Sequence, residues 1–143
     1  MNSRAQSQIS FGMIFAIILI IIFIAFAIYG INKFLATSRL VQIESFKSDL
    51  QSDIDKMYRS PQGSQIVGPY LIPRKIKQIC FKDDPKENLY FEPDDYDGDL
   101  LNNIDMDKTL GHQTKLCIDS PNGKVSMTIK KAFTDRNGVT ITR

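Results

Sequence analysis

Two cysteines, Cys80 and Cys117, are the residues best suited to covalent chemistry in this chain of 143 residues. Both fall in segments that read as β-strands, and they do not form a Cys-x-x-Cys pair. The only histidine is His112, so soft ligands are too few for a structural zinc site. In an oxidising compartment we expect the two thiols to form a disulfide. In a reducing compartment they would remain as two buried core cysteines.

An acidic segment, residues 83–107, holds the carboxylates that could bind a cation. Its ten acids and one base give it a charge of 1 − 10 = −9, which leaves +11 for the rest of a chain of net charge +2. An EF-hand calcium loop with Gly98 at its sixth position would need acids where the chain has Pro93 and Ile104. Two interpretations remain, a looser carboxylate site for calcium or a solvated loop kept soluble by its charge. The acids are Asp83, Asp84, Glu87, Glu92, Asp94, Asp95, Asp97, Asp99, Asp105 and Asp107.

No pattern typical of catalysis accompanies these residues. His112 has no nucleophile motif nearby, and the chain has no glycine-rich phosphate loop, no His-Glu metal motif and no nucleophile elbow. The basic residues are scattered without interleaved aromatics, which argues against nucleic-acid binding. We therefore expect no enzyme activity, no cofactor, no metal centre and no small-molecule substrate.

An uncharged apolar stretch, residues 11–31, precedes all of these candidates. About 20 apolar residues in a helix cross the hydrocarbon core of a bilayer, so this stretch predicts a transmembrane helix. Residues 1–10 form a short polar leader, and no small-residue cleavage site follows the apolar run, so the anchor is expected to be retained. Arg4 lies before the helix and Lys33 and Arg39 lie after it, so the positive-inside rule does not decide the orientation.

An amphipathic continuation of the same helix is predicted over residues 32–60. From Ile43 the apolar residues recur at steps of 3, 4, 4 and 3, which is the helical period, and no Pro or Gly interrupts the stretch before Pro61. This stripe needs a covering partner. Its members are Ile43, Phe46, Leu50, Ile54 and Met57, and we expect the opposite face, which includes Lys47, to be solvated.

Residues 65–143 predict the covering β domain. Strand patterns occur at 66–72, 75–81, 88–91, 114–118, 124–130 and 139–142, and Asn122-Gly123 predicts a hairpin turn between the fourth and the fifth. The expected fold class is therefore α+β. A long N-terminal transmembrane and amphipathic helix packs on one small antiparallel sheet of four or five strands, which carries the acidic segment 83–107.

The string Arg4 to Gly12, which runs directly into the apolar helix, resembles the class III signal of archaeal type IV pilin-like proteins. Gln8-Ile9-Ser10 matches the first part of the family pattern, and Gly12 stands where the family has Glu. The resemblance implies that a leader is cut just before the hydrophobic helix. Cleavage before Gln8 and cleavage after Ala5 are both open, so the candidate processing residues are Ala5, Gln6, Ser7 and Gln8.

The resemblance and the layout together predict a structural role. We expect a single-pass, pilin-like subunit of a surface filament or other homo-oligomer, assembled in the membrane through its N-terminal helix, with the β domain extracytoplasmic. The alternative is a bitopic accessory or binding subunit of a larger membrane complex, whose acidic segment meets a basic patch. Helix packing is expected at Phe11, Gly12, Ile14, Ile18, Ile21, Phe23, Phe26, Tyr29 and Gly30.

Overall fold

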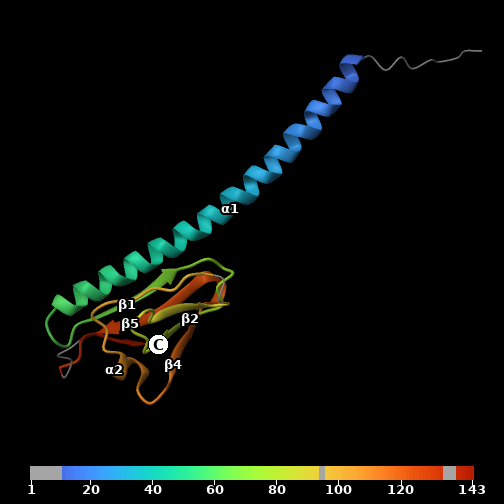
Figure 1. Cartoon of the computed structure of the whole chain (residues 1–143). Coiled ribbons are helices and arrows are strands. Elements are labelled where there is room, and N and C mark those ends of the chain that lie inside the picture. The colour runs from blue at the N-terminus through green and yellow to red at the C-terminus, as the bar shows by residue number, and fades with distance from the viewer. Residues whose placement is uncertain (1–10, 94–95, 134–137) are drawn as a thin grey trace, which may run out of the picture. The chain divides into compact units, whose positions relative to one another are not determined.

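The computed structural model describes residues 11–93, 96–133 and 138–143. The chain divides into two units at Ser38–Arg39, and each unit is described by itself. The predicted leader, residues 1–10, lies outside the described residues, and so do the candidate processing residues within it. Figure 1 shows the elements in chain order from blue to red.

One helix, α1 (Phe11–Arg59), contains both the predicted membrane segment and its continuation. Its apolar N-terminal part is long and apolar enough to cross a membrane by length and composition, and its side chains up to Ala36 are exposed. The helix ends where the sequence predicts, since Pro61 disfavours a helical Ser60. Lys56 and Arg59 lie in the last turn, where positive charge is favourable beside the free carbonyls.

Two three-stranded antiparallel sheets, rather than the single predicted sheet, form the β part of the unit that begins at Arg39. The first sheet has the order β1 (Gln65–Leu71), β5 (Lys124–Lys130), β6 (Thr140–Thr142). The second has the order β3 (Leu89–Glu92), β2 (Gln78–Lys82), β4 (Lys115–Asp119). The α+β class is confirmed, and the expectation of one sheet is wrong.

The predicted hairpin between residues 114 and 130 is also wrong, because β4 and β5 belong to different sheets. A short 3₁₀ turn, η1 (Pro121–Gly123), joins them, with Asn122 and Gly123 at φ values of 58° and 77°. The Ile72 N–H donates to the Gly123 carbonyl at 3.0 Å. The two backbones are close here, and a Cβ on Gly123 would lie 2.6 Å from the Ile72 oxygen. The Asn-Gly pair therefore carries the chain from one sheet to the other.

A short helix, α2 (Met106–Leu110), was not predicted. Five residues are too few to display a helical period, and in the sequence Asp105 is indistinguishable from the other acids of its segment. The Asp105 side chain caps this helix by accepting a hydrogen bond from the Lys108 N–H at 3.1 Å. The predicted strand at 75–81 begins only at Gln78, because Ile76 N–H closes a turn onto the Pro73 carbonyl at 3.0 Å.

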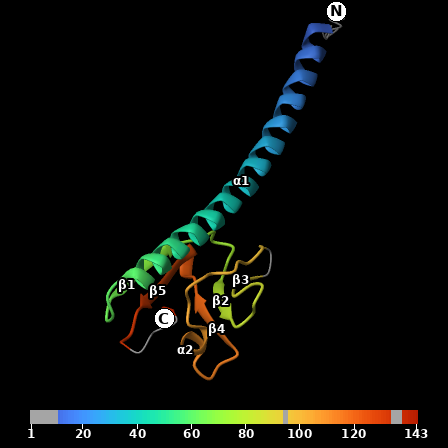
Figure 2. The same cartoon turned by 60° about the vertical axis from the view of Figure 1, so that its left-hand side comes forward.

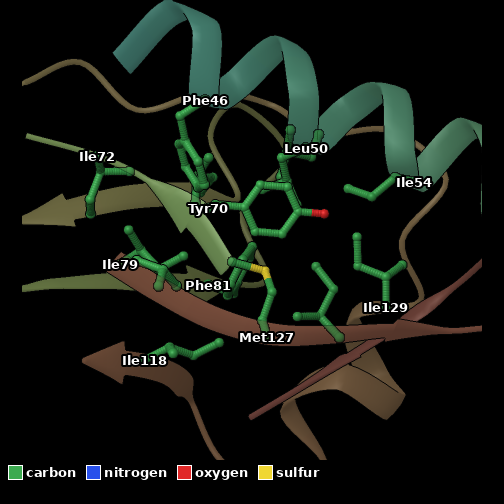
Figure 3. Packing of buried hydrophobic residues seen from close by; sticks show 14 of the residues in the cluster. Phe46, Leu50, Ile54, Tyr70, Ile72, Ile79, Phe81, Ile118, Met127 and Ile129 are labelled. Atoms are coloured by element: carbon green, nitrogen blue, oxygen red, sulfur yellow. The ribbon is translucent and has the colours of Figure 1, made fainter. Parts of the chain in front are cut away.

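The apolar stripe of α1 is buried as predicted, with Ile43, Phe46, Leu50, Ile54 and Met57 all in the core. Phe46 contacts both sheets: its ring centroid lies 5.8 Å from that of Tyr70 on β1 and 6.1 Å from that of Phe91 on β3. Figure 3 shows Phe46, Leu50 and Ile54 reaching from α1 toward Tyr70 and Met127. Figure 2 gives a second view of this helix beside the strands.

Leu50→Ala tests whether this stripe holds the domain together. Leu50 is fully buried, so we expect the substitution to lower the free energy of unfolding by about 2–5 kcal/mol through lost burial and a cavity. The measurement is denaturant unfolding of the full chain in detergent micelles. Val41→Ala, on the same helix but 62% exposed, should change stability by no more than about 0.5 kcal/mol. Equal losses in both variants would contradict the assignment.

Candidate functional site

Cys80 and Cys117 form a disulfide, as expected for an oxidising environment. They are direct register partners on β2 and β4, and they lie on the face of the second sheet opposite to Ile79 and Phe81, which point into the core. Adjacent hydrogen-bonded strands hold the two sulfur atoms in place. The two cysteines are separated by 37 positions in the sequence, and the chain between them contains the whole acidic segment.

The acidic segment is distributed over several local contacts and does not converge on one point in the part that the structure describes. Asp84 pairs with Lys82 at 3.2 Å, and Glu92 pairs with Lys115 at 3.0 Å. A hydrogen bond from the Lys86 N–H, assisted by Lys82, lowers the pKa of the Asp84 carboxyl. These contacts fit the interpretation of a solvated acidic segment.

Among the described residues, one group could bring three metal-ligating atoms together: Cys80, Glu92 and Cys117, with ligand atoms within 4.8 Å of one another. Both sulfur atoms are already joined in the disulfide, so this group offers one carboxylate. The looser calcium site gains no support from the described acids, while Asp94 and Asp95 lie outside the described residues.

Part of the acidic segment is fastened to α1 through three residues spaced four apart, Lys47, Gln51 and Asp55. Lys47 Nζ donates to the Gly98 carbonyl at 3.2 Å and contacts Glu44 at 3.1 Å. Gln51 accepts from the Asn102 N–H at 2.9 Å, and Asp55 accepts from the Asn103 amide at 2.9 Å. The expectation of a solvated Lys47 is wrong. Its side chain is buried, and its ammonium group contacts the Glu44 carboxylate and the Gly98 carbonyl at the edge of the acidic segment.

Buried Asn88 makes a second attachment within the acidic segment, between its own side chain and the backbone of Leu101. Its side-chain amide donates to the Leu101 carbonyl and its oxygen accepts from the Leu101 N–H, both at 2.8 Å. It therefore satisfies both backbone groups of a residue that lies outside any strand. Gly98 is required nearby, because a Cβ there would lie 2.2 Å from the Leu89 carbonyl oxygen.

A groove of about 950 Å³ lies beside β1, between that strand and α1. Its helical wall includes Asp49 and Asp53, and Tyr70 on β1 donates its hydroxyl hydrogen to Asp53 at 2.7 Å. Burial, the hydrogen bond to Asp53 and the charges of Asp53 and Asp49 together raise the pKa of Tyr70 far above its usual range. Arg74 and Lys124 also line this groove. Sequence reasoning missed this site, although Asp49 and Asp53 at i,i+4 beside the apolar stripe were a signal.

His112 and the predicted helix-packing residues do not line this groove. His112 is exposed, between α2 and β4. The nine predicted helix-packing residues, from Phe11 to Gly30, all lie on α1 with exposed side chains, and Phe11, Phe23 and Phe26 are 84%, 69% and 71% exposed. The described residues thus offer two polar features, the groove and the fastened acidic segment.

Asn88→Ala tests the attachment of the acidic segment. The substitution leaves the Leu101 N–H and carbonyl without their partner, so we expect a loss of about 2–4 kcal/mol in the free energy of unfolding. Asn102→Ala is the matched control, because the Asn102 contacts to Gln51 come from its backbone and its side chain is exposed. A loss below about 1 kcal/mol for Asn88→Ala, or an equal loss for Asn102→Ala, would contradict this role.

Tyr70→Phe tests the hydrogen bond in the groove. Below pH 10 the free energy of unfolding of the wild type should exceed that of the variant by about 1–2 kcal/mol, because the hydroxyl is hydrogen-bonded to a carboxylate. Above pH 10 the unfolded tyrosine releases its proton while the folded one retains it, so the wild type loses stability and the difference shrinks. Denaturant unfolding of both proteins between pH 7 and pH 11 measures this difference. A difference that stays constant over that range would contradict the raised pKa.

The chain was compared with protein-family models, curated proteins and solved structures, and none of the three comparisons finds a match.

Proposed function

We propose that this chain is a single-pass, membrane-anchored structural subunit of a cell-surface filament or similar assembly, of the type IV pilin-like kind, without catalytic activity. The first part of α1 is its anchor and its contact with neighbouring copies. The domain from Arg39 onward lies outside the cytoplasm in this proposal. The observation that carries it is the composition of α1, in which one helix is apolar on all sides at its start and amphipathic at its end.

The exposure pattern along α1 supports this division of roles. From Phe11 to Ala36 every side chain is exposed, and most are large and apolar, which in water would be costly. From Ile43 to Met57 the side chains of the apolar stripe are buried in the domain. A helix surface of the first kind needs lipid or other apolar helices around it. The Cys80–Cys117 disulfide is consistent with a domain in an oxidising compartment.

The leader adds a second line of support. Gln8-Ile9-Ser10 before the apolar helix resembles a class III signal, and cleavage there would leave α1 at the new N-terminus. Mass spectrometry of the protein purified from its native membrane tests this directly. A mature chain that begins at Gln6 or Gln8 supports the proposal. A chain that retains residues 1–10 argues for a plain anchor and against processing as a pilin.

Replacing Gly12 and Gly30 by leucine tests self-assembly through the anchor. Small residues let helix backbones approach closely, so we expect the oligomers extracted in mild detergent to dissociate to monomers in this variant. At Gly30 an added Cβ meets nothing within 4 Å, so there is room at this position for a side chain within a single chain. Native mass spectrometry measures the stoichiometry.

Ile20→Leu is the control, because it keeps the apolar volume at a position outside the predicted packing set. It should leave the oligomers intact. A strictly monomeric wild-type chain in native membranes would contradict the proposal.

A bitopic accessory subunit of a larger membrane complex is the second candidate. The acidic segment favours it, because its part from Gly98 to Asn103 is hydrogen-bonded to Lys47, Gln51 and Asp55 of α1, which holds the nearby charge of Asp99 in a fixed place. A basic surface on another subunit would complement it. Co-purification with unrelated membrane subunits in a fixed ratio, without homo-oligomers, would favour this candidate over the filament subunit.

A further inference from the structure

Strand β1 is an edge strand, since among the described residues it pairs with β5 alone. The Lys131 N–H donates to the Ser64 carbonyl at 2.9 Å and the Ile72 N–H to the Gly123 carbonyl at 3.0 Å, one beyond each end of β1. Hydrogen-bonded positions alternate along an antiparallel pair, so the even-numbered residues of β1 bond to β5. Val67 and Leu71 therefore turn both backbone groups to the free edge, where Pro69 offers its carbonyl.

The C-terminal part of the free edge borders the groove described above. The groove of about 950 Å³ lies along Pro69, Tyr70 and Leu71, and its opposite wall is the polar side of α1, with Asp49 and Asp53. An added strand would turn alternate side chains toward this wall and the others to the outer face of the sheet. On that outer face Val67 and Leu71 are 68% and 70% exposed, so the edge presents acids on one side and apolar side chains on the other.

The Asp49 carboxylate lines this groove and has no partner among the described residues. Asp53 accepts the hydrogen bond from Tyr70, whereas Asp49 makes no hydrogen bond or ion pair with any described residue. Both carboxylates act on the Tyr70 hydroxyl, which places their charge on the groove side of α1. The cations that line the groove, Arg74 and Lys124, come from the β domain.

We propose that this groove binds an extended peptide segment of another protein, in which basic and apolar residues alternate, as an additional strand on the edge of β1. The partner's backbone pairs with Val67 and Leu71. Its basic side chains lie toward Asp49 and Asp53, and its apolar side chains lie beside Val67 and Leu71. This mode of recognition takes affinity from main-chain hydrogen bonds and specificity from alternate side chains. The proposal concerns the domain from Arg39 onward and does not depend on whether the anchor self-assembles.

A short capped peptide of alternating lysine and valine, carrying a fluorophore, is the probe. The full chain is held in nanodiscs of zwitterionic phosphatidylcholine, and binding is measured by fluorescence anisotropy with empty nanodiscs as the blank. We expect saturable binding to the chain. The same peptide with glutamate in place of lysine should bind at least about tenfold more weakly, because its charge opposes Asp49. A version N-methylated at alternate residues should also bind at least about tenfold more weakly, because its methylated backbone nitrogens cannot donate hydrogen bonds to the edge of β1.

Asp49→Asn should weaken the binding of the lysine peptide about three- to fivefold, as expected for loss of one partly exposed ion pair. Asp119→Asn is the control, since Asp119 is exposed on β4 in the second sheet and does not line this groove. Absence of saturable binding overturns the proposal. Equal binding of the N-methylated peptide, or an equal effect of Asp119→Asn, also overturns it, because either result would show adsorption by charge alone.

Discussion

The burial of one helical stripe between two sheets is the contact on which this domain depends. In the part of the chain that the structure describes, each sheet has three strands, and the apolar face of a sheet must be covered by another element. The side chains from Ile43 to Met57 provide the missing surface, and Phe46 joins the two sheets by contacting Tyr70 of one and Phe91 of the other. The helix is therefore part of the core.

The acidic segment shows how a charged stretch can be kept close to such a core. A segment with charge −9 repels itself, and burying any of its backbone without partners would be costly. Local pairs neutralise some of the acids, and Asn88 satisfies the backbone of Leu101. Lys47 brings a positive charge from the helix to the Gly98 carbonyl. The charge is thereby spread over short contacts at the surface of the fold.

Local periodicity explains what could be predicted from the sequence. The stripe from Ile43 to Met57, the end of α1 before Pro61 and most strand positions depend on residues close to one another in the chain, and these predictions are confirmed. The Cys80–Cys117 pair was also within reach, because two cysteines allow one pairing.

Strand partners could not be predicted, because they depend on tertiary packing. The turn at Asn122-Gly123 has the residues of a hairpin, but the Ile72–Gly123 hydrogen bond makes it a crossover between sheets. Lys47 follows Ile43 by four residues and so lies on the buried stripe, although its charge suggested the opposite face. The groove beside β1 could not be predicted for the same reason. It is lined by residues of α1, by the end of β1 about twenty positions later, and by the turn at Asn122.

The pairing of β1 with β5 sets the order in which this chain can complete its fold during synthesis. Gln65 finds its register partner only at Lys130, so the first sheet lacks its central strand until nearly the whole chain has been made. Until then the core lacks Val125, Met127 and Ile129 of β5, which pack in the same cluster as the apolar stripe of α1. Non-local pairing of this kind is slow and exposes intermediates to aggregation. A chain truncated before residue 124 would lack the central strand of the first sheet and so could not form the native core.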